Sequence, residues 1–195
     1  MELILASTSP YRKMLLDARG IVYKAVAPMC DEDALKDPQL DALALTQKLA
    51  QAKAESLKPL YPQAYIIGSD QVLSFNNKIY GKPKTKEKAL AQLLELQGKT
   101  HHLVTSLCLS SPQKTWIHTE TVALTMHPWS QAELELYINA DMPLDCAGSY
   151  KLEKKGLLLF KEIQAQDYES IIGLPLLKLF SILKGEGFTF FNLPI

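Results

Sequence analysis

Hydroxyl residues and cations follow directly on an apolar segment near the start of the chain. Residues 3–6 read "LILA", and "STSPYRK" comes next. This pattern predicts a buried strand over 3–6 and a helix capped by Ser9, with Pro10 in its first turn. Arg12 and Lys13 then lie in that first turn, where backbone N–H groups already carry partial positive charge. Such cations are unfavourable unless an anion compensates them. The pattern therefore indicates either a phosphate site, to which Ser7 adds a hydroxyl, or a capped helix with solvated charges.

Carboxylates that could act as a base or bind a metal occur in two segments. Asp70 lies in "IIGSDQV", which we expect to be an apolar strand broken at 68–70. A side chain at such a break can enter a cleft, although Gly-Ser-Asp more commonly forms a turn closed by the Asp side chain. Glu32, between Asp31 and Asp33, lies in a segment expected to be a polar loop. Its oxygens could bind Mg²⁺, but acidic loops are usually only solvated.

Two lysines could contact a phosphate group. Lys82 lies in "GKP", where the following Pro83 favours an extended backbone that displays the lysine. Lys53 lies within a helix predicted over 40–57. The simpler alternatives are a solvated turn lysine and a helix lysine whose stem covers apolar surface.

The segment "CAGSYKLEKKG", residues 146–156, combines small residues with a carboxylate. The small residues at 147–149 permit close approach of the backbone to a ligand. Glu153 could face that ligand, or it could be one charge on a hairpin that we expect to turn near Gly156. None of the four histidines has the spacing of a metal site.

The composition excludes several classes of protein. The chain has 195 residues, 47% of them hydrophobic, and 21 basic residues balance 21 acidic ones. A neutral chain has no global field for a nucleic acid polymer or a membrane surface, so an anion must meet a local cluster of cations. The three cysteines lack any paired spacing, which favours a reducing compartment. No apolar run approaches the length of a membrane span, so we expect a soluble, cytoplasmic protein.

Alternating and helical patterns predict the elements that must position these residues. Strands alternate with helices in the first half, and a strand pair follows residue 100. A final helix is expected over 171–188, with Pro175 near its start. This order predicts a single α/β domain with a mixed sheet, because a simple doubly wound fold would lack the later strand pair.

Several of these segments together resemble the Maf family of nucleotide pyrophosphatases. The resemblance spans residues 3–187, and at least six segments occur in the family order: "LILASTSPYRKMLL", "CDE", "LAQAKA", "IIGSDQV", "GKP", "CAGSYKLE" and "IIGLPL". It implies an inosine-triphosphatase-like fold, with an elongated mixed β-sheet, flanking helices and a cleft between two lobes of one domain over 1–195. It also implies a homodimer.

The resemblance further implies a reaction and its residues. The reaction is hydrolysis of a nucleoside triphosphate to the monophosphate and pyrophosphate with a divalent metal, Mg²⁺ or Mn²⁺. Asp70 would accept a proton, and Glu32 and Asp70 would bind the metal. The residues implied for phosphate binding are Ser7, Arg12, Lys13, Lys53 and Lys82. The family usually has two arginines where this chain has Arg12 and Lys13, so the bidentate fork at position 13 is lost.

Within the family, the chain looks like the subfamily that acts on 7-methyl-GTP. Methylation at N7 makes guanine cationic and strengthens its N–H donors, which a carboxylate at Glu153 could accept. Arg12, Gln71 and Glu153 are therefore the candidates for base specificity. The alternatives are a dTTP/UTP pyrophosphatase, a nucleotide-binding regulator of septum formation without turnover, and a monophosphatase.

Overall fold

The computed structural model describes residues 1–191, and the chain folds into two compact units. The first unit comprises residues 1–70, 105–120 and those from 167 on, and the second comprises 71–104 and 121–166. No helix within the described residues is long and apolar enough to cross a membrane.

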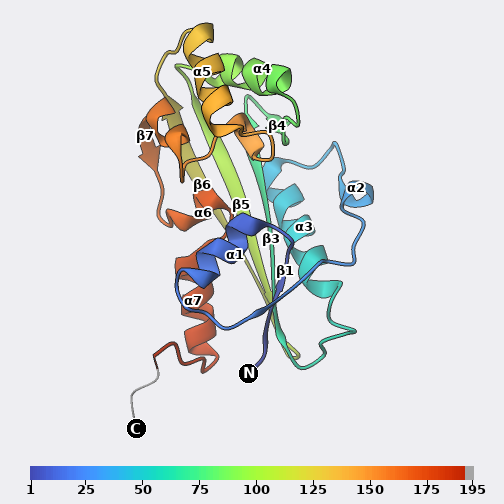
Figure 1. Ribbon diagram of the computed structural model, residues 1–195. Coiled ribbons are helices and arrows are strands. Elements are labelled where there is room, and N and C mark those ends of the chain that lie inside the picture. The colour runs from blue at the N-terminus through green and yellow to red at the C-terminus, as the bar shows by residue number, and fades with distance from the viewer. Residues whose placement is uncertain (192–195) are drawn as a thin grey trace. The chain divides into compact units, whose positions relative to one another are not determined.

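The first unit holds the N-terminal and C-terminal helices (Figure 1). Its elements are β1 (Leu3–Ala6), α1 (Pro10–Asp17), β2 (Lys24–Val26), α2 (Glu32–Leu35), α3 (Ala42–Glu55), α6 (Glu169–Ile172) and α7 (Leu176–Gly185). The second unit has β4 (Lys78–Tyr80), α4 (Lys86–Leu96), α5 (Gln131–Asp141), the 3₁₀ helices η1 (Ala147–Ser149) and η2 (Lys155–Leu159), and β7 (Phe160–Gln164). Three long strands contribute to both units: β3 (Tyr65–Phe75), β5 (Thr100–Ser110) and β6 (Thr115–Met126).

Within residues 1–191 the strands form one seven-stranded sheet in the order β2-β1-β3-β5-β6-β7, with β4 paired to β3. β1 is parallel to both β2 and β3, whereas β3–β4 and β6–β7 are antiparallel. The prediction of an α/β fold with a mixed sheet and flanking helices is therefore confirmed.

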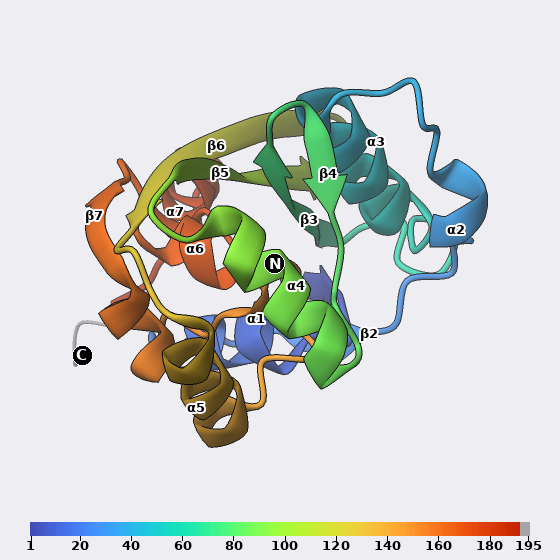
Figure 2. The ribbon, with the colours of Figure 1, turned by 90° about the horizontal axis from the view of Figure 1, so that it is seen from above.

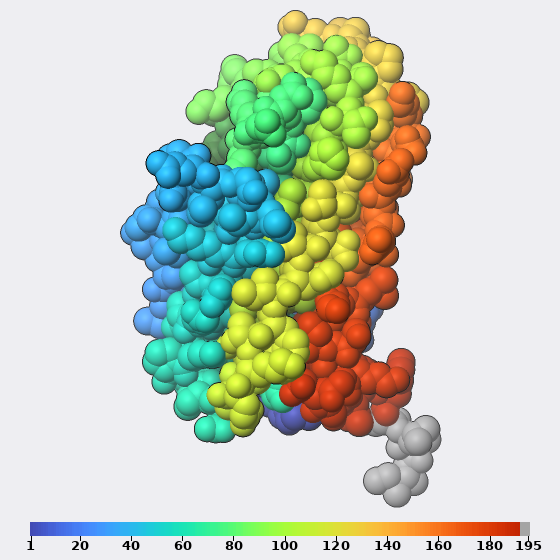
Figure 3. Space-filling view, turned by 180° about the vertical axis from the view of Figure 1, so that it is seen from behind, coloured from blue at the N-terminus to red at the C-terminus, as the bar shows by residue number. Residues whose placement is uncertain are grey.

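Helices cover both faces of the sheet in the first unit. Alternate residues of β1, β3 and β5 point to opposite faces, as strand geometry requires. One face packs against α1 and α7 through Leu3, Leu5, Leu16, Ile67, Leu107 and Leu179. The other face packs against α3 through Ile4, Ala6, Ala50, Ala54, Ile66 and Cys108. Figure 3 shows this second face, where the light-blue to cyan atoms of α3 and the teal residues that follow it lie beside the yellow-green end of the β5–β6 hairpin.

In the second unit α4 and α5 pack against one another (Figure 2). Their buried residues are Ala89, Leu93 and Leu96 of α4 and Leu134, Tyr137 and Ile138 of α5. An aromatic cluster of His101, Tyr150 and Phe160 adds to this core, with Tyr150 and Phe160 meeting edge to face.

The predicted cap at the start of α1 is confirmed, and two further helices begin with a side-chain cap of the same kind. Ser9 caps α1 with Pro10 at its beginning, and Thr85 caps α4. Ser130 caps α5 in a capping box with Glu133. These caps depend only on residues within one turn, which explains why sequence alone reveals them.

Four other predictions were wrong. β3 runs unbroken through 68–70, because residues 65–70 all pair or pack inside the sheet. The expected loop after residue 31 contains α2, which Asp31 caps. The segment that begins at residue 146 contains two 3₁₀ helices, η1 and η2, rather than a hairpin turning near Gly156, and β7 pairs with β6 instead. The expected final helix is two helices, because Gly173 adopts a φ of 118° and ends α6.

Candidate active site

The Arg12 guanidinium is held in place where β1 passes into α1. Its Nε donates to the carbonyl oxygen of Gly173 at 2.9 Å, and its Nη1 donates to the Ser7 hydroxyl at 3.2 Å. The Arg12 backbone N–H meets the Ser9 side chain that caps α1. Two of the five guanidinium N–H groups thus hold the side chain in position. Among residues 1–191, Nη2 has no hydrogen-bond partner, so this nitrogen can bind an anion.

The Gly173 carbonyl is the acceptor on which this arrangement depends. It also lies 2.9 Å from the Ser69 hydroxyl of β3, so a buried strand and a helix end meet at one oxygen. Gly173 has a φ of 118°, and a Cβ there would lie 3.6 Å from Arg12 Nε. Sequence reasoning gave this residue no role. The chain separation of 161 residues between the two partners left no local signal.

The α6 segment that carries Gly173 is fastened at both ends. Asp167 is buried and accepts a hydrogen bond from the Leu177 N–H at the start of α7, at 2.7 Å. Glu169 forms an ion pair with Arg19, beyond the end of α1. Burial raises the pKa of the Asp167 carboxyl, although the hydrogen bond from Leu177 opposes that shift.

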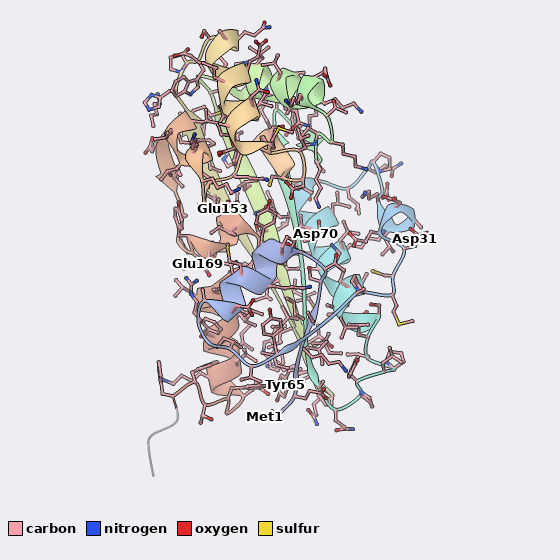
Figure 4. The ribbon with its side chains drawn as sticks, viewed as in Figure 1. Met1, Asp31, Tyr65, Asp70, Glu153 and Glu169 are labelled. Carbon is pink, nitrogen blue, oxygen red and sulfur yellow. The ribbon has the colours of Figure 1, made fainter. Side chains whose placement is uncertain are left out.

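A buried lysine joins the two candidate carboxylates. Lys53 is only 5% exposed, and its Nζ lies 2.7 Å from Asp70 Oδ1 and 2.9 Å from Glu32 Oε2. The Lys53 ammonium also donates to the Ser69 carbonyl oxygen, which lies 3.5 Å from Nζ. Figure 4 shows Asp70 close to the N-terminal end of α1. Because all three ammonium donors point to protein oxygens, Lys53 organises the carboxylates; its predicted contact with phosphate stays a prediction.

Gly68 explains how Lys53 reaches Asp70. A Cβ at Gly68 would lie 2.1 Å from the Ala50 carbonyl oxygen and 2.8 Å from the Ala54 backbone nitrogen. The missing side chain therefore lets α3 lie directly against β3. Lys53 on that helix and Asp70 on that strand can then meet on the same face of the sheet.

The cluster of Arg12, Lys53, Glu32 and Asp70 has two positive and two negative groups. Burial lowers the pKa of the Arg12 guanidinium, while the nearby charges of Asp70 and Glu32 oppose this shift. The half-exposed Glu32 leaves one side of the cluster open to solvent. Since the cluster is already neutral, a highly charged anion bound here would need further positive charge.

The carboxylate pair fits a hard divalent cation. Glu32 and Asp70 both reach the same ammonium nitrogen, so their oxygens lie close together. Mg²⁺ is commonly bound through one or two carboxylates together with substrate phosphates. No group of three or more His, Cys, Asp and Glu residues that could hold a metal occurs in the described part of the chain.

The other predicted residues divide between the two units. Lys13 is half-buried beside Arg12 in the first unit. Gln71, Lys82 and Glu153 belong to the second unit, where Lys82 and Glu153 are exposed. The backbone around Glu153 is fixed on both sides: the Tyr137 hydroxyl accepts from the Lys151 N–H at 3.0 Å, and Asp141 accepts from the Gly156 N–H at 3.1 Å.

The chain belongs to the Maf family, because the model for Maf-like proteins matches residues 2–186. It is similar to three curated proteins named 7-methyl-GTP pyrophosphatase. The relative from Bdellovibrio bacteriovorus is 46% identical over 95% of this chain and 97% of its own length. Those from Pseudomonas aeruginosa and Colwellia psychrerythraea are 38% and 39% identical, each over 95% of this chain and over 97% and 92% of their own lengths.

Among solved structures, a nucleoside-triphosphatase (dITP/XTP pyrophosphatase) from Mycobacterium abscessus has a TM-score of 0.43 and 13% identity. The match covers 81% of this chain and 93% of that one. This likeness is too weak to bear on function.

Proposed function

We propose that this protein hydrolyses 7-methyl-GTP to 7-methyl-GMP and pyrophosphate. The observation that carries the proposal is the buried Lys53, which holds Glu32 and Asp70 together beside the positioned Arg12. The names of the three relatives support the choice of substrate.

In the proposed reaction Asp70 accepts the proton of the attacking water. Asp70 binds Lys53 through Oδ1, so Oδ2 is the oxygen available for that proton. Arg12, through Nη2, and the helix N-terminus that follows Ser9 bind the phosphates, with Lys13 and Lys82 as further cations. Lys53 keeps the two carboxylates in position.

A divalent cation, Mg²⁺ or Mn²⁺, belongs to the proposal. Glu32 and Asp70 would hold it, and it would supply positive charge for the leaving pyrophosphate and polarise water. The neutrality of the four-residue cluster supports this requirement, because Lys13, Lys82 and the helix N-terminus alone would not balance the negative charge of a triphosphate. A homodimer and a cytoplasmic location complete the proposal.

The decisive experiment is a substrate screen with pyrophosphate detection. We expect 7-methyl-GTP to give the highest kcat/KM among 7-methyl-GTP, GTP, UTP and dTTP, and activity to disappear with EDTA and return with Mg²⁺ or Mn²⁺. Asp70→Asn should lower kcat at least about a hundredfold, since it removes the base. Orthophosphate rather than pyrophosphate as the product would overturn the proposal and support the monophosphatase alternative. Nucleotide binding without any turnover would establish a regulator.

Base selection is tested separately at Glu153. A charge-assisted hydrogen bond contributes roughly 1.5–3 kcal/mol, so Glu153→Gln should reduce the preference for 7-methyl-GTP over UTP by about ten- to a hundredfold. The exposed neighbour Lys154 offers a matched control, because Lys154→Gln should leave the preference unchanged. An unaltered ratio in the Glu153→Gln enzyme would remove Glu153 from base recognition.

A further inference from the structure

One amide side chain on α4 joins two loops of the second unit. Gln92 lies 2.6 Å from the Ser149 hydroxyl through Oε1, and its Nε2 donates to the Gly81 carbonyl oxygen at 3.2 Å. One loop, residues 81–85, leads from β4 into α4, and the other, residues 142–154, follows α5. No predicted function used Gln92.

The chemistry of the two partners fixes the orientation of this amide. A backbone carbonyl can only accept a hydrogen bond, so the Gln92 NH₂ group must face Gly81. The Gln92 oxygen then faces Ser149, whose hydroxyl must donate. Gln92 therefore uses one acceptor and one donor, and a residue that lacks either group would lose one of the two connections.

The loop on the Ser149 side depends on such a support. Ser149 is fully buried and has a φ of 64°, in the left-handed region of backbone conformation that residues other than Gly rarely adopt. The preceding Gly148 has a φ of 80°, and a Cβ there would lie 2.4 Å from Leu73 Cδ1. Backbone held in this conformation persists only where surrounding contacts determine it, and the Gln92 bond is one of those contacts.

Each of the two loops carries a residue of the proposed substrate site. Lys82, proposed for phosphate, follows Gly81 directly. Beyond Ser149 the chain is held by the Tyr150 hydroxyl, 3.0 Å from His101 Nε2, and then reaches the exposed Glu153. Short, supported backbone thus connects Gln92 to Lys82 on one side and to Glu153 on the other.

We propose that Gln92 is a positioning residue that sets the Lys82 loop and the Glu153 loop relative to one another. It would thereby couple triphosphate binding to recognition of a cationic purine, without touching the nucleotide itself. The inference rests on the proposed function of Lys82 and Glu153. When the loop of Lys82 or of Glu153 binds a nucleotide, the other loop would already be in position to bind the same nucleotide.

Two substitutions separate the two connections. Gln92→Met keeps the length of the side chain and good helix propensity but removes both hydrogen bonds. Gln92→Glu keeps an acceptor for Ser149 but cannot donate to Gly81. A backbone hydrogen bond from Lys84 N–H to the Leu144 oxygen, 3.0 Å long, remains in both variants and supports folding. The exposed Lys88 on the same helix provides the control Lys88→Met.

Steady-state kinetics give the first readout. Gln92→Met should raise KM for 7-methyl-GTP about tenfold and reduce its preference over UTP, because both groups lose their support. Gln92→Glu should raise KM for both nucleotides alike and keep the preference, since only the Lys82 loop is released. Lys88→Met should match the wild type. A Gln92→Met enzyme with unchanged KM and unchanged preference would overturn the proposal.

Hydrogen exchange of the free protein gives a readout that does not require activity. Gln92→Met should speed exchange in both residues 81–85 and residues 147–153, whereas Ser149→Ala should speed it only in the second segment. Exchange equal to the wild type in both segments of Gln92→Met would overturn the coupling even in an active enzyme. If the wild type hydrolyses no nucleoside triphosphate, the proposed function fails, while the exchange comparison still decides whether Gln92 joins the loops.

Discussion

At the residue scale, the buried ammonium group of Lys53 forms ion pairs with two carboxylates of the first unit, Glu32 and Asp70. Lys53→Met would leave Asp70 and Glu32 close together without their shared counterion. Removing one partner of a buried ion pair costs several kcal/mol, and the partial exposure of Glu32 reduces that cost. We expect the free energy of unfolding, measured in urea, to fall by roughly 2–3 kcal/mol.

The exposed Lys48 on the same helix offers a matched control for Lys53. Lys48→Met removes the same charge from α3 without leaving a carboxylate unpaired, so its effect should stay within about 0.5 kcal/mol. Equal losses in the two variants would show that Lys53 acts through the helix rather than through Asp70 and Glu32.

The three free thiols differ in reactivity for a physical reason. Burial raises the pKa of the Cys108 thiol to about 12, and Cys108 lies in the core beneath α3. Cys30 and Cys146 are half-buried and within reach of a reagent, although burial also raises the pKa of the Cys30 thiol. Because the thiolate is the reactive form, a thiol reagent at pH 8 should label Cys30 and Cys146 in the native protein and Cys108 only after denaturation. Labelling of Cys108 at the rate of the other two would contradict this packing.

At the element scale, the contact between α3 and β3 depends on Gly68. Gly68→Ala would place a methyl group 2.1 Å from the Ala50 carbonyl oxygen, which forces helix and strand apart. We expect a loss of about 3 kcal/mol or more in the free energy of unfolding, together with reduced activity as Lys53 moves from Asp70.

Gly185, at the end of α7, is the matched control for Gly68. A Cβ there meets nothing within 4 Å, so Gly185→Ala should be neutral or stabilise the protein by about 0.5–1 kcal/mol. Thermal unfolding of the two variants provides the comparison. A Gly68→Ala protein as stable as Gly185→Ala would show that α3 can shift at little cost.

The elements also show what sequence can and cannot predict. The capped start of α1 and the mixed sheet followed from local signals, since caps and alternation are written within a few residues. Gly68 was interpreted from the sequence as part of a break in β3. A glycine that lets a helix pack closely against a strand cannot be told from a glycine that interrupts a strand by its residue type alone. Its true role requires knowing what lies opposite.

The site itself was only partly predictable. Residue types and order named Arg12, Lys53 and Asp70. Their protein partners came from the fold: Lys53, whose contact with phosphate stays a prediction, meets two carboxylates, and Arg12 donates to a carbonyl oxygen of residue 173. A backbone carbonyl carries no sequence signature, so such a partner appears only when distant segments are placed together.

At the scale of the whole molecule, one buried histidine shapes how stability depends on pH. His101 has no exposed surface, and burial, with a smaller contribution from the charge of His102, lowers its pKa from 6.5 to about 4. The unfolded chain therefore binds more protons than the folded one between pH 6.5 and 4. The free energy of unfolding must fall as the pH falls through this window, by about 2–3 kcal/mol from this group.

Substitution of His101 removes that dependence and leaves the other titrating groups in place. His101→Gln should flatten the curve of unfolding free energy against pH between 6.5 and 4, whatever its effect at pH 7 from the lost bond to the Tyr150 hydroxyl. His102→Gln, at an exposed position on the same strand, should keep nearly the wild-type slope. Urea unfolding at intervals of pH measures the difference, and parallel curves for the wild type and His101→Gln would mean that carboxylates alone cause the loss in acid.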